Sequence, residues 1–454
     1  MASVVKSRHD SLDYLLAGRQ VKSWLVGLSA VATNNSGYMF TGMIGFTYVT
    51  GLSSIWLMIG WLLGDLAGSF FIHKRLRIAT ESSDQYSFSG VLSHWNGTDY
   101  RKLRFICGLI SLIFMGAYAA AQLNAGSKAL HVLFGWDLSA GAMIGSTIVL
   151  MYCFVGGIRA SIWTDAAQSV VMIVSMTVLL IFAIQNAGGV EEALLRLQEV
   201  SPVYMSWMPS ELPVQGWLGP LLFVIGWCFA GFGVVGQPHI MIRFMTLDKP
   251  QNIAMARIYY YSWFTLFYAV TIAVGLMARI LIPSMESFDS ELALPIMSAQ
   301  LLPPVLVGLM LAGLFGATMS TADSLILSCS ASLTRDFFIG KKENFWITKL
   351  STVLISLLVL GIALSGNKSV FQLVLYSWAV LAAAFGPLLI VYCLGQQVSE
   401  RLAIAMVLTG AATVIVWTQL GWSRFIYEIA PGILSGLLVF LIGQWSGRID
   451  NLQK

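Results

Sequence analysis

Apolar segments about as long as a membrane is thick recur along the whole chain of 454 residues. A helix needs about 20 residues to cross a hydrocarbon core of about 30 Å. Charged residues make up only 11% of the chain, against roughly 25% in soluble domains. These observations predict an all-α polytopic membrane protein and exclude a soluble multidomain enzyme. The glycines, prolines and charges between the segments place twelve spans at residues 22–47, 51–73, 105–127, 139–156, 163–186, 216–242, 255–283, 303–332, 345–365, 369–394, 401–420 and 425–446.

The basic residues predict the orientation of the chain, because Lys and Arg are enriched in cytoplasmic loops. With the N-terminus inside, 21 of the 26 basic residues fall in cytoplasmic segments. Both termini are therefore predicted to lie in the cytoplasm, with the protein in the cell (inner or plasma) membrane. Residues 1–19 contain no apolar run, so no cleavable signal peptide is predicted.

The two longest outer loops, residues 187–215 and 284–302, are acidic. We expect a short interfacial helix in each of them. Their charge fits two interpretations, a vestibule that attracts cations and an ordinary solvated loop. The solvated loop is the simpler interpretation.

Two of the predicted spans contain stretches that a helix facing lipid tolerates poorly. The first span holds SAVATNNSGYMFTG (29–42), in which adjacent asparagines and a glycine weaken the helix. The sixth span holds AGFGVVGQPH (230–239), where Pro238 removes a backbone donor and disfavours helix at the residue before it. Irregular backbone at this depth is tolerated where it is buried or lines a cavity. Each break alone fits equally well a kink where small residues pack.

The positions of the two breaks favour a transporter. Paired interrupted helices at matching positions in two opposed halves are typical of inverted-repeat secondary transporters. The predicted organisation is a cytoplasmic N-terminal segment (1–21), a first inverted repeat (22–187), an outer loop (188–215), a second inverted repeat (216–394), and two peripheral helices with a short cytoplasmic tail (395–454). The binding site is expected where the two breaks meet, near the middle of the membrane.

The eighth span is rich in hydroxyl groups. Ser320 and Thr321 are neighbours, and the carbonyl of Ala317 lies one turn earlier on the same side of the helix. Na⁺ is a hard cation that prefers several oxygen ligands. Carbonyls freed by the first break, such as those of Ala32 and Asn35, complete a predicted sodium cage. Serines in such helices often bond only to their own carbonyls, but the density of oxygens opposite a break favours the cation.

Three carboxylates lie in or at the edge of predicted spans, at Asp65, Asp165 and Asp323. Acids at this depth are costly and are functional by default. Asp65 stands alone and fits equally well a hydrogen-bonded structural acid. Asp323 and Ser324, with Asp165 across the bundle, are predicted to hold a second cation or a proton.

Five stretches of the sequence resemble the sodium:solute symporter family. They are DYLLAGR (13–19), SAVATNNSG (29–37), FVGGIRASIWTDAAQSVVM (154–172), GQPHIMIRFM (236–245) and MSTADSLILSCSASLTRDFF (319–338). The resemblance covers nearly all of the chain and is nearest to the sodium/proline symporters. It implies a leucine-transporter-type 5+5 inverted-repeat core with about 12 transmembrane helices. It also implies a sodium site between the first and eighth helices, formed by the backbone oxygens of Ala32, Asn35 and Ala317 and the hydroxyls of Ser320 and Thr321.

The resemblance further implies a second sodium site and a solute pocket. Some members are similar in using an aspartate and a hydroxyl at the positions of Asp165 and Ser324 for a second sodium ion. In proline symporters the pocket is lined by the first break, the third core helix and the GQPH segment. The matching positions here are Ser36, Gly37, Tyr118, Gln237 and Pro238.

Three departures from the proline symporters bear on specificity and length. The aspartate of their first break is Asn34 here, which predicts a different sodium affinity or coupling. Their Trp and Tyr before GQPH are Ala230 and Val234 here, which predicts a wider or less selective pocket. The family usually has one more helix before residues 13–19, so that peripheral helix is expected to be absent or the chain to be N-terminally shortened.

Together these features predict a sodium-coupled secondary symporter that imports a small organic solute, such as proline or a related amino acid, by alternating access. Na⁺ is the expected coupling ion, with no organic cofactor and no nucleic-acid partner. The alternative is a transporter-like solute sensor that acts through a separate signalling partner. The five scattered histidines and the lack of a nucleophile–base set argue against an enzyme. The solute, the Na⁺ stoichiometry, the use of H⁺ in place of Na⁺ and the oligomeric state are left open at this point.

Overall fold

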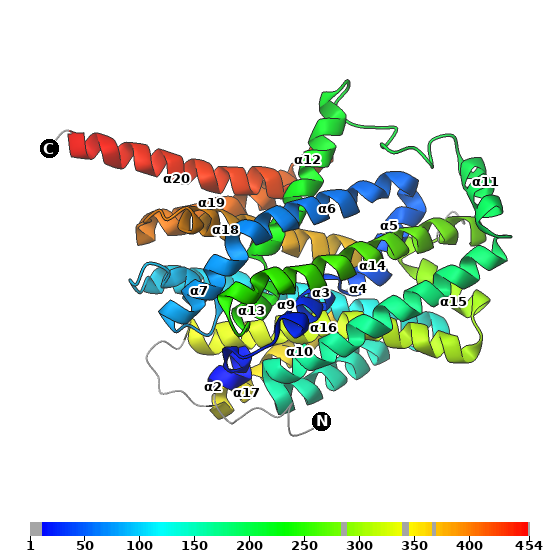
Figure 1. Cartoon of the computed structure of the whole chain (residues 1–454), viewed down its shortest axis with the longest axis horizontal. Helices are drawn as coiled ribbons and strands as arrows, with labels where there is room; N and C mark the ends of the chain where they lie inside the picture. The colour runs from blue at the N-terminus through cyan, green and yellow to red at the C-terminus, as the bar shows by residue number, and fades with distance from the viewer. Residues whose placement is uncertain (1–10, 283–287, 338–344, 366–368, 453–454) are drawn as a thin grey trace.

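The fold of the chain is all α-helical in a computed structural model that describes residues 11–282, 288–337, 345–365 and 369–452. Residues 1–10 of the predicted N-terminal segment, part of the predicted outer loop 284–302, the two basic residues Lys341 and Lys342 predicted to be cytoplasmic, and the last two residues lie outside this description. Most of the helices run roughly along the long axis of the molecule (Figure 1). The described residues form no strand, and one isolated parallel bridge joins Val21 and Leu247.

The helices divide at the long outer loop. The first part contains α2 (Ser11–Leu16), α3 (Ser23–Asn34), α4 (Gly37–Phe40), α5 (Gly42–Thr50), α6 (Ile55–Gly68), α7 (Lys74–Ser83), α8 (Phe88–Ser93), α9 (Arg101–Phe134), α10 (Leu138–Asn186) and α11 (Val190–Val200). The second part contains α12 (Leu218–Phe232), α13 (Pro238–Met245), α14 (Ile253–Leu281), α15 (Ala293–Leu301), α16 (Pro304–Arg335), α17 (Phe345–Leu364), α18 (Val370–Cys393), α19 (Glu400–Gln419) and α20 (Ile429–Leu452). The short 3-10 or π segments are η1 (Ala17–Arg19), η2 (Gly51–Ser54), η3 (Ser69–His73), η4 (Gly233–Gly236), η5 (Pro250–Asn252), η6 (Ser290–Leu292) and η7 (Trp422–Arg424).

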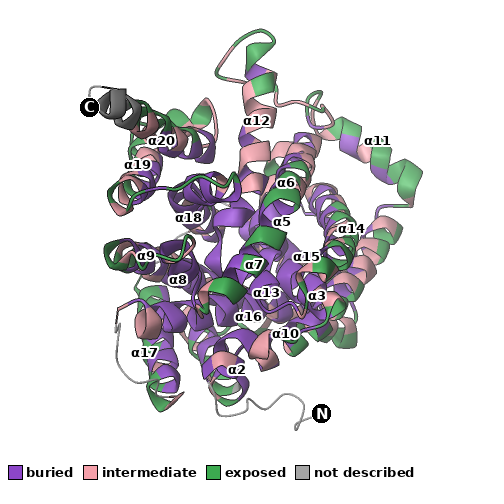
Figure 2. Cartoon of the chain, turned by 60° about the vertical axis from the view of Figure 1, so that its left-hand side comes forward, coloured by how far each residue is buried: buried purple, intermediate pink, exposed green. Residues whose placement is uncertain are grey.

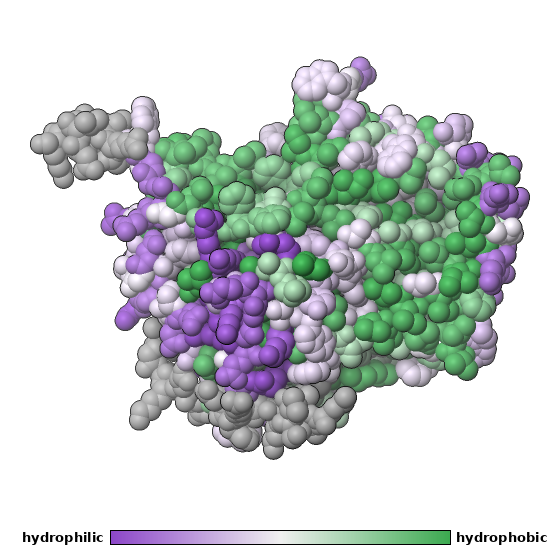
Figure 3. Space-filling model, in the orientation of Figure 1, coloured by the Kyte–Doolittle hydropathy of each residue, from purple (hydrophilic) through white to green (hydrophobic). Residues whose placement is uncertain are grey.

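Hydrophobic helices long enough to cross a membrane account for most of the described chain. Within it, nine segments have the length and composition of a span, and two shorter apolar helices cover Leu138–Met151 and Ile429–Trp445. One of the nine, Gly37–Ser83, includes the end of the first predicted span and all of the second. Figure 3 shows hydrophobic residues over the middle of one face and hydrophilic residues gathered at its two ends. The structure confirms a multi-pass all-α protein.

The fourth and fifth predicted spans are joined differently from the expectation. Instead of a loop at residues 157–162, α10 continues through a sharp kink at Gly157, which has φ 56° and ψ −150°. Glycine adopts this conformation without steric cost. A Cβ atom there would also lie 2.6 Å from the backbone oxygen of Tyr14 in α2. The turn therefore needs a single glycine, which brings the kink against the N-terminal helix.

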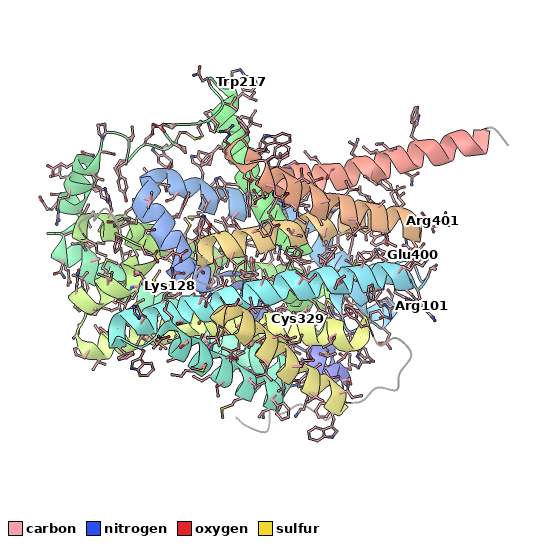
Figure 4. The ribbon with its side chains drawn as sticks, turned by 180° about the vertical axis from the view of Figure 1, so that it is seen from behind. Arg101, Lys128, Trp217, Cys329, Glu400 and Arg401 are labelled. Atoms are coloured by element: carbon pink, nitrogen blue, oxygen red, sulfur yellow. The ribbon has the colours of Figure 1, made fainter. Side chains whose placement is uncertain are left out.

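The two ends of the bundle carry charged residues. Figure 4 shows Arg101, Glu400 and Arg401 near one end of the molecule and Lys128 toward the other end. Lys128 forms ion pairs of 2.8 Å with Asp289 and 2.7 Å with Glu291. The short helices expected in the two outer loops are present as α11 and α15.

Glu291 is not solvated. This differs from the interpretation of the acidic segments 187–215 and 284–302 as ordinary solvated loops. Its side chain is buried. It accepts hydrogen bonds from the hydroxyl of Ser369 at 2.7 Å and the backbone nitrogen of Phe371 at 2.9 Å. A carboxylate stabilises the free N–H groups at the start of a helix. Glu291 therefore ties the outer loop to the first turn of α18.

The core of the bundle surrounds α16 and α18. The helix α16 packs against α9 and α10 and also against α3 and α4, where the chain is broken. Among the described spans, α18 is the most buried, and Figure 2 shows buried residues concentrated in the centre of the bundle. The broken segments therefore lie in the interior, away from lipid.

Two glycines allow α6 and α12 to approach each other closely. A Cβ atom at Gly64 would collide with the backbone oxygen of Cys228, and one at Gly231 would collide with that of Trp61. Because the obstacle is backbone in both cases, a larger side chain requires the helices to separate.

Gly64→Val is therefore expected to lower the free energy of unfolding by about 1–3 kcal/mol, the usual cost of overpacking. The measurement is the melting temperature of the purified protein in detergent. Gly361→Val in α17 is the matched control, because no atom lies within 4 Å of the Cβ position there. Equal melting temperatures for the two variants would contradict this account of the packing.

Candidate functional site

The first predicted break is present between α3 and α4. Asn35 (φ −90°, ψ 69°) and Ser36 (φ −67°, ψ −171°) have non-helical backbone conformations. The nitrogen atoms of Asn35 turn back to the helix, with the backbone N at 2.9 Å and Nδ2 at 3.0 Å from the carbonyl oxygen of Val31. The hydroxyl of Ser36 accepts a hydrogen bond from the backbone nitrogen of Tyr38 at 3.2 Å. Asn35 and Ser36 thus break the helix by the local bonding that their side chains favour.

The second predicted break is present between α12 and α13. The chain passes through the tight turn η4, and Gln237 then adopts an extended conformation with φ −95° and ψ 102°. Pro238 begins α13 at the first helical position, where the absence of an N–H group costs nothing. The glycines and the Gln–Pro pair therefore act as the sequence predicted.

Hydroxyl groups of α16 lie against carbonyl groups of α3 just before the first break. Ser320 Oγ is 3.2 Å from the carbonyl oxygen of Ala32 and 3.1 Å from that of Ala317. Thr321 Oγ1 is 2.9 Å from the carbonyl oxygen of Thr33. All five residues are buried. The structure therefore brings four of the predicted sodium ligands together and adds Thr33, the next carbonyl in the last turn of α3.

This group of oxygens has the chemistry of a site for a small hard cation. It offers three carbonyl and two hydroxyl oxygens, which suit alkali and alkaline-earth cations. A serine hydroxyl has one proton to donate, so Ser320 cannot fully satisfy both carbonyls beside it. The ligand set carries no formal charge, which suits a monovalent ion. The residues present therefore fit Na⁺.

The predicted second cation site contains a guanidinium group that sequence reasoning missed. The structure brings Asp165, Asp323 and Ser324 together around Arg243, near the end of α13. One nitrogen of Arg243 is 3.1 Å from Asp165 Oδ2 and 3.6 Å from Asp323 Oδ1, and all three side chains are fully buried. The same nitrogen donates to the hydroxyl of Ser324. Arg243 was visible in the GQPHIMIRFM stretch, but nothing local to it indicated two acids on other helices.

The two groups of polar residues are connected through Ser324. Its hydroxyl lies 2.5 Å from the carbonyl oxygen of Ser320 and 3.2 Å from the hydroxyl of Thr33. On the acidic side, the hydroxyl of Ser29 donates to Asp165 at 2.6 Å. Direct hydrogen bonds therefore link the two groups of oxygens.

Some of the predicted solute-pocket residues form a second cluster around the two breaks, where the ring of Tyr118 packs against that of His239 at 5.3 Å between centroids. The hydroxyls of Tyr118 and Ser36 lie 3.4 Å apart. The backbone nitrogen of Gly37 donates to Gln122 Oε1 at 2.9 Å, a residue of α9 that sequence reasoning missed. Across the cluster, Gln237 donates to the carbonyl oxygen of Trp378 at 2.9 Å.

Several polar atoms of this cluster are buried without a protein partner. Among the described residues these include Gln122 Nε2, Gln237 Oε1 and both ring nitrogens of His239. Buried polar groups in folded proteins are almost always paired. Atoms left in this condition around a helix break are therefore suited to a polar ligand.

The small residues Ala230 and Val234 are both buried, and Ala230 contacts an aromatic side chain of another helix. The indole nitrogen of Trp378 in α18 donates to the carbonyl oxygen of Ala230 at 3.0 Å. The rings of Trp378 and Trp61 lie 4.9 Å apart. Asn34, in contrast, is directed to α14, where Nδ2 lies 2.5 Å from the hydroxyl of Tyr260.

The site is closed toward both sides of the bundle. At the end that the sequence predicts to be outer, the ring of Phe371 stacks on Tyr38 at 5.5 Å and on Phe46 at 5.2 Å between centroids. At the end that the sequence predicts to be inner, Val21 pairs with Leu247, whose carbonyl oxygen also accepts a hydrogen bond from Arg77 at 2.6 Å. All of the predicted site residues are buried. Protein atoms therefore enclose the predicted site in this structure.

Arg243→Met is expected to lower the free energy of unfolding by about 3–5 kcal/mol, because it leaves Asp165 and Asp323 buried without the guanidinium. The measurement is the melting temperature in detergent. Adding Asp165→Asn and Asp323→Asn to this variant removes the unbalanced charges and should recover most of the loss. A melting temperature of Arg243→Met equal to that of the unmodified protein would contradict the charge balance described above.

Comparison with known proteins shows the family to which the chain belongs. Residues 14–410 match the model of the sodium:solute symporter family. The chain is 29% identical to the sodium/proline symporter of Salmonella typhimurium strain LT2, over 96% of this chain and 88% of that protein. It is 30% identical to the high-affinity proline transporter PutP of Bacillus subtilis strain 168, over 95% of this chain and 92% of that protein.

Solved structures share the fold. A Na⁺-coupled sialic acid symporter in a substrate-bound outward-open state superposes with a TM-score of 0.79 at 18% identity, covering 96% of this chain and 92% of the other. MhsT in complex with L-phenylalanine gives a TM-score of 0.60 at 13% identity, covering 96% and 99% of the two chains. The fold is that of the leucine-transporter type, as predicted. The chain belongs to the sodium:solute symporter family, and it is a multi-pass sodium-coupled transporter and not an enzyme.

Proposed function

We propose that the protein imports a small zwitterionic solute, such as proline or a related amino acid, together with Na⁺ across the cell membrane. The observation that carries this proposal is the contact of the Ser320 and Thr321 hydroxyls with the carbonyls of α3 beside the first break. The names of the curated relatives, which are proline transporters, support the choice of solute.

The proposed sodium ion bridges α3 and α16. Its proposed ligands are the backbone oxygens of Ala32, Thr33, Asn35 and Ala317 and the hydroxyls of Ser320 and Thr321. A cation in this position replaces the hydrogen bonds that the hydroxyls now donate to carbonyls with stronger ion–oxygen contacts. Sodium therefore stabilises the close approach of the two helices and, through it, the shape of the first break.

The proposed solute site lies between the two breaks. A solute carboxylate takes the place of Gln122 Oε1 at the backbone nitrogen of Gly37, and it accepts further hydrogen bonds from Gln122 Nε2 and the Tyr118 hydroxyl. Gln237 Oε1 accepts from the solute ammonium. The proposed pocket residues are Asn34, Ser36, Gly37, Tyr118, Ala230, Val234, Gln237 and Pro238.

Transport by alternating access requires the contacts on each side of the buried site to open in turn. Separation of Phe371 from Tyr38 and Phe46 opens the outer side. Separation of the chain at Val21 from Leu247 opens the inner side. In the proposed orientation the end of the bundle with Arg101 and Arg401 faces the cytoplasm, and both termini lie there.

The second cation is proposed at Asp165, Asp323 and Ser324. Two carboxylates and one guanidinium leave this group with one negative charge when all three are ionised. Arg243 balances half of the acidic charge while the site is closed. A second Na⁺ would balance the remaining half, and Ser324 would transmit its binding to the first sodium site.

The direct test of the function is uptake of a panel of labelled amino acids by proteoliposomes that contain the purified protein. An inward Na⁺ gradient is expected to drive accumulation of proline or a related solute at least ten-fold above an equal choline gradient. Liposomes without protein are the control. Uptake that is equal in sodium and choline for every solute would overturn the proposal.

The sodium site is tested by Ser320→Ala and Thr321→Ala. Each variant removes one neutral ligand, and the Na⁺ concentration for half-maximal uptake is expected to rise about ten-fold, equivalent to about 1.4 kcal/mol of binding free energy. Ser328→Ala, two turns further along α16 and also buried, is the matched control and should leave this concentration unchanged. An unaltered sodium dependence in both site variants would place the ion elsewhere.

A further inference from the structure

Asp65 is a buried carboxylate in α6 to which the proposed transport cycle gives no role. Its side chain is completely buried. Tyr260 and Tyr261, adjacent residues of α14, donate their hydroxyls to its two oxygens, at 2.7 Å to Oδ2 and 2.9 Å to Oδ1. No ion pair between described residues includes Asp65. Its oxygens are therefore bonded by two hydroxyl groups and not by a basic side chain.

A chain of hydrogen bonds connects Asp65 to the first break. The hydroxyl of Tyr260 lies 2.7 Å from Asp65 and 2.5 Å from Asn34 Nδ2. A tyrosine hydroxyl has one proton, and the carboxylate of Asp65 accepts it. The group of Asn34 that approaches the same hydroxyl must then be a donor, which is the amide nitrogen.

The direction of this chain determines which atom of Asn34 is available to a ligand. With Nδ2 committed to Tyr260, the amide oxygen is the atom that Asn34 can offer. An amide oxygen accepts hydrogen bonds and coordinates hard cations. Asn34 immediately precedes Asn35 and Ser36, where the helix is broken.

We propose that Asp65 is a positioning residue of the transport site, which acts through Tyr260 to hold the amide of Asn34 with its oxygen available to a positively charged group. That group is Na⁺ or the ammonium of the solute. The inference rests on the proposed function, because it assigns Asn34 to the transport site. Asp65 itself touches neither ligand.

One consequence is that positions 34 and 65 carry a single carboxylate between them. Asn34→Asp would place two carboxylates on either side of one hydroxyl that has one proton. Like charges at this separation in a dry interior oppose each other strongly. The single variant is therefore expected to lose transport, although aspartate and asparagine have nearly the same shape.

Exchanging the two residues should repair this damage. In the double variant Asn34→Asp with Asp65→Asn, the amide at position 65 donates to Tyr260, and Tyr260 donates to the carboxylate at position 34. The chain keeps the same number of hydrogen bonds and the same charge, with its direction reversed. A residue with a purely structural role at position 65 would give no reason for such recovery.

The two tyrosines supply a matched pair of variants. Tyr260→Phe and Tyr261→Phe each remove one hydroxyl from Asp65 and leave an aromatic ring. Only the first variant also interrupts the chain to Asn34. The ring of Tyr260 packs against Phe244 and Phe264, contacts that phenylalanine retains.

The experiment measures uptake of labelled proline by the full chain in proteoliposomes, with the melting temperature of each variant recorded in parallel. The unmodified protein must first show sodium-dependent uptake. If it shows none, the proposed function itself fails, whereas normal uptake with unaffected variants contradicts only the inference about Asp65. Asp65→Asn and Tyr260→Phe are each expected to raise about ten-fold either the Na⁺ concentration for half-maximal uptake or the solute KM. Tyr261→Phe is expected to change the same constant less than two-fold. An increase in the Na⁺ constant identifies Na⁺ as the cationic partner of Asn34, and an increase in the solute KM at saturating Na⁺ identifies the solute ammonium.

The exchange provides the decisive comparison. The rate of sodium-dependent uptake of the double variant is expected to be within about three-fold of that of the unmodified protein. Asn34→Asp alone is expected to lower this rate at least ten-fold. The inference is overturned if the double variant is no better than Asn34→Asp. Equal effects of Tyr260→Phe and Tyr261→Phe on uptake would overturn it as well. This pair of variants still tests the inference if the variants at Asp65 do not fold.

Discussion

The satisfaction of backbone oxygens at the broken helices is the constraint on which the rest of this structure depends. In the interior of a membrane no bulk water is present to bond a carbonyl that a helix has released. Here the carbonyls of Ala32 and Thr33 face the hydroxyls of Ser320 and Thr321 on α16. This contact draws the first break into the centre of the bundle, and the same oxygens are the ones that a sodium ion would use.

The buried charges follow the same requirement by two different means. Asp165 and Asp323 share the guanidinium of Arg243, whereas Asp65 relies on the hydroxyls of two tyrosines. Both arrangements end at the residues around the first break, one through Ser324 and Thr33 and the other through Tyr260 and Asn34. Hydrogen bonds from two groups of buried ionisable side chains thus reach the first break from two sides.

The features that could be predicted were those encoded by local pattern. Runs of apolar residues marked the spans, and Asn35–Ser36 and Gln237–Pro238 marked the breaks at the positions where the structure has them. Arg243, Gln122 and Tyr260 were missed because their partners lie from 78 to 226 residues away in the chain. A long-range partner leaves no periodic or motif signal in a single sequence. The six-residue loop expected after residue 156 became a kink at one residue because Gly157 alone makes the turn.

The sequence by itself determined that this chain spans a membrane many times and that two of its helices are interrupted, because hydropathy and local backbone preference act over a few turns of helix. Only the tertiary structure decided which oxygens meet across the interruption, that a guanidinium lies between Asp165 and Asp323, and that Asp65 reaches Asn34 through one hydroxyl. These are contacts between distant segments. Their geometry follows from how the helices pack, and a residue's neighbours in the chain do not specify it.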